Sequence, residues 1–316
     1  MPRSAATGPQ FLLTAQTPQG PATATVTAVA AGLREYALNG IELVEGFAAE
    51  SVPPLGAGTV LVPWPNRIRD GRWRHDGERH QLAITEPNQG NAIHGLLAVT
   101  AYQPVAQSTD SVTLAATVYP QAGYPYQLDT TVRYTLTAEG LEVSHSIRNV
   151  GGEAAPVALG THPYLKIGDV PTADLVLRLA AGSHIDVDHR LNPVGVTPVD
   201  GTDFDLRAGA RVGDLDLDDG FGDVVVTNGR GEHSLTAPDG RRVTLWGDEN
   251  MAYVQAFTPR NFPVRTGDTV QLGLAVAIEP MTAPADAFNS GHGLRWLAPG
   301  EEWVIRWGIA PTGFAD

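Results

Sequence analysis

The sequence predicts an all-β protein built from many short antiparallel strands. Apolar and polar residues alternate with period two over most of the chain, which is typical of strands that turn one face toward a core. Glycine (35 residues) and proline (24 residues) are abundant enough to supply the turns between such strands. Long apolar stripes with the 3.6-residue helical period are absent. Together these observations favour a large antiparallel β-sandwich.

The alternation defines individual strands along the chain. Strands are predicted at Ser111–Val118, Thr131–Leu136, Leu141–Arg148, Leu175–Leu179, Arg242–Trp246, Tyr253–Phe257 and Trp303–Ile309. The second and third form a hairpin, because Ala138-Glu139-Gly140 between them reads as a turn. The best helical candidate is a short turn at Pro284–Phe288, with the proline near the first helical position. No linker, composition step or repeat of fixed period interrupts the pattern, which predicts a single domain over residues 1–316.

Composition and charge exclude several classes of function. The chain has 316 residues, of which 42% are hydrophobic and 18% charged, as in a folded globular protein. Its formal net charge of -14 repels phosphate backbones and anionic lipid, so neither a nucleic-acid nor a membrane partner is expected. The absence of cysteine excludes disulfides, thiolate nucleophiles and iron–sulfur clusters. With no signal-peptide pattern and no apolar run of about 18 residues, a cytoplasmic monomer or small homo-oligomer is expected.

Four stretches place ionisable or aromatic side chains beside prolines and glycines, where a fixed backbone can present them rigidly. In chain order they are Val62–Trp73, Asn91–Leu96, Gly160–Leu165 and Ala277–Phe288. Taken singly, each has a plainer explanation. A histidine in a β-protein is often a hydrogen-bonded structural residue, and Trp64 and Trp73 fit a core. The arginines of the first stretch fit the solvent-facing side of a strand; they are Arg67, Arg69, Arg72 and, just beyond it, Arg74.

Taken together, in this order and at these separations, the four stretches resemble the aldose 1-epimerase (galactose mutarotase) family. The resemblance extends from Pro-Asn-Arg-Ile at 65–68 to Pro-Gly-Glu at 299–301. It implies a large antiparallel β-supersandwich, with Glu279 as catalytic base and His162 as catalytic acid. Each of these two residues precedes a proline, which biases its backbone toward an extended geometry.

The resemblance also implies residues that bind the sugar. By motif position these are Arg67 of Pro-Asn-Arg-Ile and His94 of Ile-His-Gly. An aspartate three residues before an aromatic residue is implied as well, and Asp218 before Phe221 has that spacing. The residues between them differ from the pattern of the better-known mutarotases, which leaves Asp219 as the alternative. Trp64, Trp73 and Trp296 are candidates for stacking on the sugar, or for the core.

The chemistry of anomer interconversion accounts for this pair of residue types. A base must take the proton of the C1 hydroxyl while an acid protonates the ring oxygen, so two groups of opposite initial protonation must flank the sugar. A carboxylate and an imidazolium meet that need without a cofactor. No phosphate-binding Gly-rich motif is found, so no nucleotide cofactor is expected.

Two metal sites are alternatives. His94, His162 and Glu279 have the composition of a two-histidine, one-carboxylate site. Asp214, Asp216 and Asp218 resemble the start of a calcium loop, but its sixth and twelfth positions hold Asp219 and Val225 in place of the required Gly and Glu. Neither is favoured, so no metal is expected.

The expected function is therefore an aldose 1-epimerase acting on a small-molecule sugar, an aldohexose. A hexose-6-phosphate 1-epimerase is an alternative, because Arg67, Arg69, Arg72 and Arg74 could clamp a phosphate. A non-catalytic carbohydrate-binding protein with the same fold is a further alternative. The sequence does not identify which aldose is bound.

Overall fold

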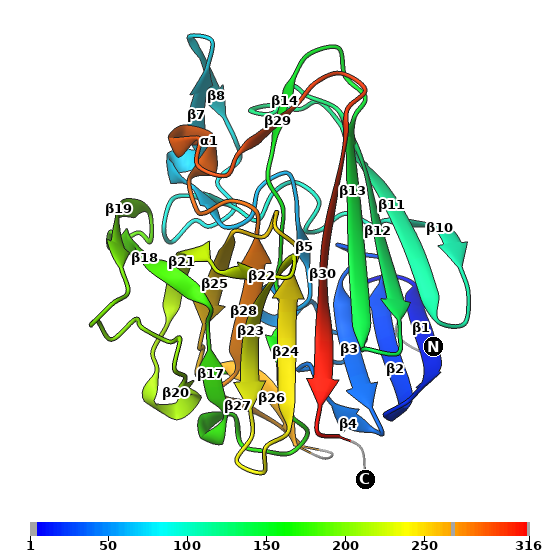
Figure 1. The fold of residues 1–316 in the computed structure, drawn as a ribbon. Helices are drawn as coiled ribbons and strands as arrows, with labels where there is room; N and C mark the ends of the chain where they lie inside the picture. Colours follow the sequence, from blue (N-terminus) through cyan, green and yellow to red (C-terminus); the bar gives the residue numbers. More distant parts are fainter. Residues whose placement is uncertain (1–4, 267–268, 315–316) are drawn as a thin grey trace.

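The computed structural model describes residues 5–266 and 269–314 and shows a mostly β architecture of antiparallel sheets (Figure 1). The longest sheet runs through the middle of the molecule. Its strands, in the order in which they pair, are β10 (Gln103–Gln107), β11 (Ser111–Val118), β12 (Leu128–Leu136), β13 (Leu141–Asn149), β30 (Glu302–Thr312), β24 (Arg242–Gly247), β23 (Arg230–Thr236), β17 (Val176–Arg178) and β20 (Ala210–Arg211). A further strand, β22 (Val226–Thr227), pairs with β23.

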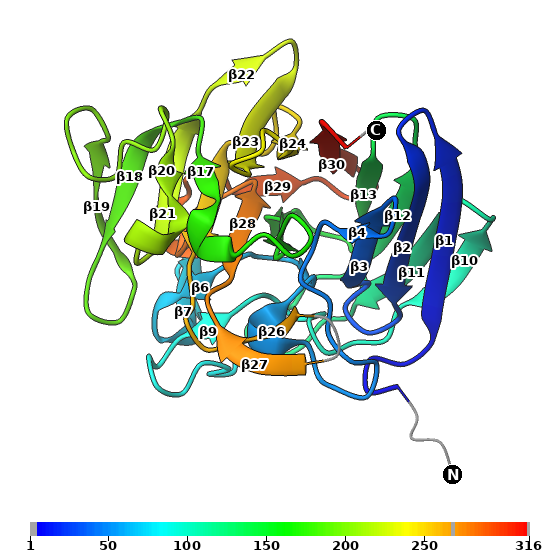
Figure 2. The same cartoon turned by 90° about the horizontal axis from the view of Figure 1, so that it is seen from below.

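A second large sheet carries the candidate site. Its order is β19 (Pro193–Pro198), β18 (Ala181–Val187), β21 (Asp218–Val224), β25 (Tyr253–Phe257), β28 (Val276–Met281), β15 (Gly160–Thr161) and β5 (Val60–Leu61), with β16 (Tyr164–Leu165) beside β28. Seen from below, this sheet lies beside β17 and β23 of the longest sheet (Figure 2). Buried side chains such as Leu177, Leu235 and Val254 belong to one continuous core.

Smaller sheets complete the fold. An N-terminal sheet lies beside β11 to β13 (Figures 1 and 2) and consists of β1 (Gln10–Thr17), β2 (Gly20–Thr27), β3 (Leu33–Leu38) and β4 (Ile41–Glu42). Four two-stranded pairs are β6 (Arg67–Ile68) with β9 (Ala92–Ile93), β7 (Arg72–His75) with β8 (Glu78–Gln81), β14 (Ala155–Val157) with β29 (Arg295–Leu297), and β26 (Phe262–Thr266) with β27 (Thr269–Gly273).

The predicted hairpin and strands are confirmed. β12 pairs with β13 so that Leu136 lies opposite Leu141, and each of the other segments predicted from alternation coincides with a strand to within a few residues. The helix α1 (Ala287–Ser290) begins later than predicted. Asp286 has a φ of 58°, so its left-handed backbone keeps Pro284 outside the helix, and the expectation of a proline near the first helical position was wrong. No helix in the described chain has the length and apolarity needed to span a membrane.

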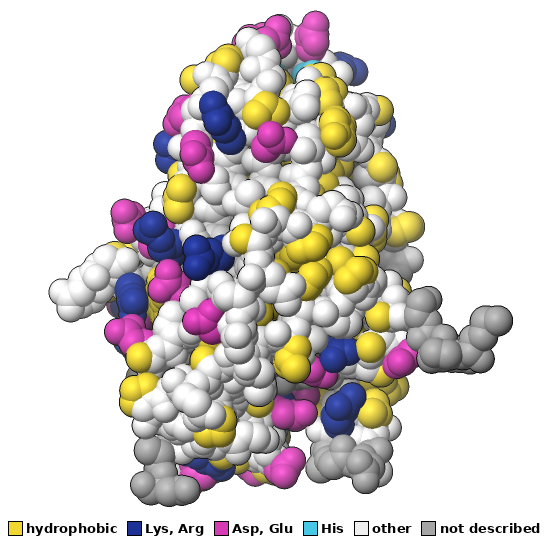
Figure 3. All heavy atoms as spheres, turned by 90° about the vertical axis from the view of Figure 1, so that its right-hand side faces the viewer, with side chains coloured by type: hydrophobic (Ala, Val, Ile, Leu, Met, Phe, Trp, Pro, Cys, Tyr) yellow, Lys and Arg dark blue, Asp and Glu magenta, His cyan; other side chains and the backbone are white. Residues whose placement is uncertain are grey.

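One face of the molecule, on the side of β10 and β1, mixes side chains of every kind. Acidic and basic side chains are interspersed there, and hydrophobic ones gather near its middle (Figure 3). Val99, Val105 and Tyr119 are among the exposed hydrophobic residues of the chain. This face therefore lacks the continuous basic surface typical of nucleic-acid binding.

Two buried histidines in the long sheet link the stability of the fold to pH. His145 on β13 accepts a hydrogen bond from the Nε1 atom of Trp307 at 2.9 Å, and burial lowers its pKa to about 3. Burial likewise lowers the pKa of His233 to about 3. Because the folded-state pKa of each lies below the unfolded value near 6.5, their contribution to stability is present above pH 6.5 and is lost as the pH falls toward 3.

We expect each of these histidines to remove on the order of 2 kcal/mol of stability between pH 7 and pH 4.5. His145→Gln keeps an acceptor for Trp307 but cannot titrate, so its free energy of unfolding should fall less over this range than that of the wild type. Urea unfolding at both pH values measures the difference, and His189→Gln, at an exposed position, is the matched control. An equally steep fall in His145→Gln would contradict the assignment.

Candidate functional site

Three neighbouring strands present polar side chains on one face of the second sheet. Glu279 on β28 lies opposite Gln255 on β25, and Gln255 lies opposite Gly220 on β21. Because side chains alternate along a strand, Asp218, two residues before Gly220, shares this face. A Cβ atom at Gly220 would lie 3.2 Å from the Oε1 atom of Gln255, so the glycine leaves room for the glutamine side chain to cross the sheet. The strand register thus brings two carboxyl groups and an amide to one surface.

His162 lies beside this surface because β15 pairs with β28, with Gly160 opposite Met281. The Nε2 atom of His162 is 3.4 Å from the Oε1 atom of Glu279, and their side chains are 5% and 3% exposed. The imidazole stacks on Tyr164, with ring centroids 5.1 Å apart. Gly56 also packs closely against the imidazole, because a Cβ atom added to Gly56 would lie 3.1 Å from the Cδ2 atom of His162. The ring is therefore fixed by packing.

His94 and Arg67 enter the site from the small β6–β9 pair, in which Arg67 lies opposite Ile93. His94 follows β9 with a φ of 63°, and its backbone N–H donates to the carbonyl of Asn66 at 3.0 Å. Its ring centroid is 5.5 Å from that of His162, with the two rings steeply inclined. This turn thus places the rings of His94 and His162 side by side, next to the sheet that carries Glu279.

The guanidinium of Arg67 is held by two carboxyl groups. Its Nε atom donates to both carboxylate oxygens of Glu86, at 3.1 and 3.0 Å, and its Nη2 atom donates to Glu86 at 2.9 Å and to Asp218 at 3.4 Å. Gln255 completes the network, because its Nε2 atom donates to Asp218 at 2.8 Å and its Oε1 atom accepts from Asn66 at 3.1 Å. The structure therefore brings all five predicted residues into one site.

Asp218 and Asp219 turn to opposite faces of β21. The carboxylate of Asp219 lies 2.8 Å from the Nε2 atom of His184, whose Nδ1 atom lies 3.0 Å from Asp186. Asp218 instead contacts Arg67 and Gln255. Geometry therefore favours Asp218 over Asp219 as the residue beside the other candidates, and a contact with sugar stays a prediction.

Burial opposes charge on both members of the central pair. Burial, together with the negative charge of Asp218, raises the pKa of Glu279 well above its usual value, while the Arg67 charge partly offsets that rise. Burial lowers the pKa of His162 to about 4. Burial, reinforced by His162 and Arg67, also lowers the pKa of His94 well below its usual value. Over a wide pH range the Glu279–His162 pair therefore holds one proton, and the neutral pair and the ion pair are two placements of that proton.

Several buried polar atoms of the site have no hydrogen-bond partner among the described residues. They are the Oε2 atom of Glu279 and the Nδ1 atoms of His94 and His162. Buried polar atoms are nearly always paired in native proteins, so a ligand that both donates and accepts hydrogen bonds is suited to this site. Such a constellation can move protons to and from hydroxyl groups. No group of three or more acidic or histidine side chains in the described chain is arranged to hold a metal ion.

The tryptophans and the remaining arginines lie elsewhere. Trp64 and Trp73 are buried and pack edge-on against Phe288 of α1, and Trp296 is partly exposed against His75. Arg69 pairs with Asp188 and Asp286, and Arg72 donates to Gln81. The contact with Asp286 joins the first and fourth motif stretches. No phosphate clamp is formed by the described contacts of these arginines.

Sequence reasoning missed Gln255, Asn66 and Glu86. Gln255 had a usable signal, because it is a polar residue inside an apolar alternating strand, and Asn66 belongs to the Pro-Asn-Arg-Ile motif itself. Glu86 lies in a loop, 19 residues beyond its partner Arg67, where no periodicity or spacing connects the two.

The described residues form an antiparallel β architecture in which a buried carboxyl–imidazole pair lies beside a paired arginine. A family model described as aldose 1-epimerase matches residues 14–309, and the chain belongs to this family. The chain is 35% identical over 280 residues to the uncharacterized protein YihR of Escherichia coli, covering 88% of this chain and 86% of that protein.

Two further proteins are similar to this chain, one in sequence and one in structure. The galactose mutarotase of Rattus norvegicus is 31% identical over 163 residues, which is 49% of this chain and 46% of that protein. The crystal structure of a GalM/aldose epimerase homologue from C. elegans has a TM-score of 0.82 at 20% identity, covering 96% of this chain and 99% of that one. This structural likeness confirms the predicted galactose mutarotase-like fold.

Proposed function

We propose that the protein is an aldose 1-epimerase that interconverts the α and β anomers of an aldohexose by general acid–base catalysis. The observation that carries the proposal is the buried Glu279–His162 pair, whose facing atoms are 3.4 Å apart. Each partner has a second buried polar atom with no hydrogen-bond partner among the described residues, which supports a polar ligand at this site. A pair that shares one proton can accept a proton from one sugar oxygen while it supplies a proton to another.

The proposed reaction starts from the ion-pair placement of the shared proton, in which Glu279 is a carboxylate and His162 an imidazolium. Glu279 takes the proton of the C1 hydroxyl, and His162 protonates the ring oxygen. The bond between C1 and the ring oxygen breaks, which gives the open-chain aldehyde. After rotation about the C1–C2 bond, the ring oxygen returns its proton to His162 and attacks the other face of C1. Glu279 then returns its proton to the C1 oxygen, which becomes the new C1 hydroxyl. Both residues end in their starting protonation states, so no cofactor is consumed.

Arg67, His94 and Asp218 are proposed to orient the sugar through hydrogen bonds to its oxygens. Arg67 and Asp218 are themselves fixed by Glu86 and Gln255, so little side-chain entropy is lost when they bind. Of the four arginines considered for a phosphate, Arg67 and Arg69 already pair with carboxylates. These contacts favour a neutral sugar over a phosphorylated one. The single domain, the cytoplasmic location and a monomer or small oligomer stay predictions from the sequence.

The test is the rate at which freshly dissolved α-D-glucose and α-D-galactose approach anomeric equilibrium, followed by polarimetry or by NMR of the anomeric proton. We expect the protein to accelerate at least one of them beyond the spontaneous rate. Glucose 6-phosphate serves as the anionic comparison and should be a poorer substrate. Binding of a sugar without acceleration would contradict the proposal and favour a carbohydrate-binding protein, and a preference for the phosphate would favour a hexose-6-phosphate epimerase.

A further inference from the structure

Glu86 is the residue that most completely determines where the Arg67 guanidinium lies. Three N–H···O contacts between 2.9 and 3.1 Å join the two side chains, compared with one contact of 3.4 Å to Asp218. Bidentate pairs of this kind fix the plane of the guanidinium as well as its position. The Nη1 atom makes a 3.5 Å contact with Asn66, longer than each contact with Glu86.

The loop that carries Glu86 is itself closely fixed. The backbone N–H of Glu86 donates to the carbonyl of Asn91 at 3.0 Å, and the N–H groups of Gly90 and Asn91 donate back to the Glu86 carbonyl. The Nδ2 atom of Asn91 also donates to the Glu86 carboxylate at 3.3 Å. From the loop after β18, the Arg190 side chain donates to the carbonyls of Gln89 and Gly90. The carboxylate of Glu86 is therefore preorganised rather than a mobile surface charge.

Glu86 is linked to the Glu279–His162 pair through Arg67, which Glu86 holds and whose positive charge lowers the pKa of Glu279. The ionisable groups that face this pair or Arg67 are Arg67 on β6, Glu86 in its loop, Asp218 on β21, His94 after β9 and Tyr164 on β16. His94 and Tyr164 are neutral near pH 7, because burial lowers the pKa of the first and raises that of the second. Two carboxylates thus surround one guanidinium, and the surroundings of the pair carry one net negative charge. Without Glu86 they would carry none.

We propose that Glu86 is a positioning residue that fixes Arg67 for ligand binding and whose negative charge helps to keep the shared proton on the Glu279–His162 pair. This inference rests on the proposed function for its consequence in catalysis. The two parts of the proposal can be tested separately. The position of Arg67 depends on the length of the side chain at position 86, whereas the proton affinity of the Glu279–His162 pair depends on the charge of that side chain. Glu86→Asp alters the length and keeps the charge, whereas Glu86→Gln keeps the length and removes the charge.

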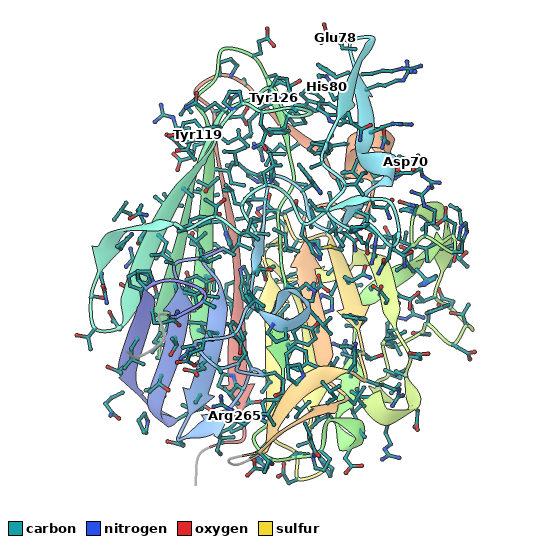
Figure 4. All side chains as sticks on the ribbon, turned by 180° about the vertical axis from the view of Figure 1, so that it is seen from behind. Asp70, Glu78, His80, Tyr119, Tyr126 and Arg265 are labelled. Atoms are coloured by element: carbon teal, nitrogen blue, oxygen red, sulfur yellow. The ribbon has the colours of Figure 1, made fainter. Side chains whose placement is uncertain are left out.

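We expect Glu86→Gln to move both limbs of the pH profile of kcat/KM to lower pH by about 0.5 to 1 unit, since removing a nearby negative charge lowers every proton affinity of the pair. Glu86→Asp should leave both limbs in place. Both variants should raise KM, because the guanidinium is less well held in each. The matched control is Glu78→Gln, which removes the same charge from the β7–β8 hairpin, away from the sheets (Figure 4), and should change neither quantity.

A readout independent of turnover separates this inference from the proposed function. In protein labelled with ¹³C at glutamate side-chain carboxyls, the Glu279 resonance is assigned by its loss in Glu279→Gln and then titrated. Its midpoint should be lower in Glu86→Gln than in the wild type and in Glu78→Gln, whether or not sugars are turned over. Unchanged limbs and an unchanged midpoint in Glu86→Gln would overturn the proposal, as would equal shifts in Glu86→Asp. A lower midpoint in Glu86→Gln, together with a wild type that has no epimerase activity, would overturn only the proposed function.

Discussion

Replacement of Glu279 by glutamine is expected to lower kcat for anomer interconversion by about 10²- to 10⁴-fold, the usual contribution of a positioned acid–base group. Glutamine has nearly the same shape but cannot accept the C1 proton. The folded protein should not suffer, because Glu279 is buried and its pKa is raised, so the charged form is costly to the native state. The melting temperature of Glu279→Gln should therefore equal or exceed that of the wild type.

The pH dependence of the wild-type rate also tests the Glu279–His162 pair. Activity requires a single proton on the pair, so the rate should fall as the pH drops through about 4, where His162 is protonated and the pair then holds two protons. It should fall again at high pH, as Glu279 loses its proton through its raised pKa. Polarimetry over this range measures both limbs. An active Glu279→Gln variant with a wild-type profile would rule out Glu279 as the base.

Much of the fold could be predicted from local sequence, whereas the site residues were implied by the resemblance of short motifs to a known family. The hairpin β12–β13 follows from alternation and a turn signal, and both are local properties of the chain. His162 and Glu279 each precede a proline, which leaves few backbone geometries open to them, and His94 was assigned by its motif position. These motif stretches carry their side chains on backbone that tertiary packing changes little.

The parts that could not be predicted depend on contacts between distant segments. Spacing alone left Asp218 and Asp219 both open, and only the pairing of β21 with β25 and β18 assigns each to a face. The start of α1 was placed too early because the backbone of Asp286 donates to Arg67 and its carboxylate accepts from Arg69, contacts invisible in the local sequence. Glu86 was missed for the same reason.

Replacement of Gly95 by alanine is expected to destabilise the protein by about 4 kcal/mol or more, well beyond most single substitutions. Gly95 has a φ of 77°, and an added Cβ atom would lie 2.1 Å from the carbonyl oxygen of Val62 and 2.4 Å from its carbon. These are backbone atoms, held by the N–H of Leu96, which donates to the same oxygen at 2.9 Å. A shift of the Gly95 backbone would also change the position of His94, the preceding residue, relative to His162.

Gly77→Ala is the matched control for this substitution. Gly77 has a φ of 82°, but no atom lies within 4 Å of the position a Cβ would take. It should therefore show only the cost of a left-handed alanine, about 1 to 2 kcal/mol. Urea unfolding of both variants measures their losses in free energy of unfolding, and the difference between these losses is the steric cost at Gly95. Mutarotation assays should show a raised KM for Gly95→Ala alone. Equal destabilisation of the two variants would mean that the backbone of Val62 does not fix the turn at His94, and the rigid placement of that histidine would have to be abandoned.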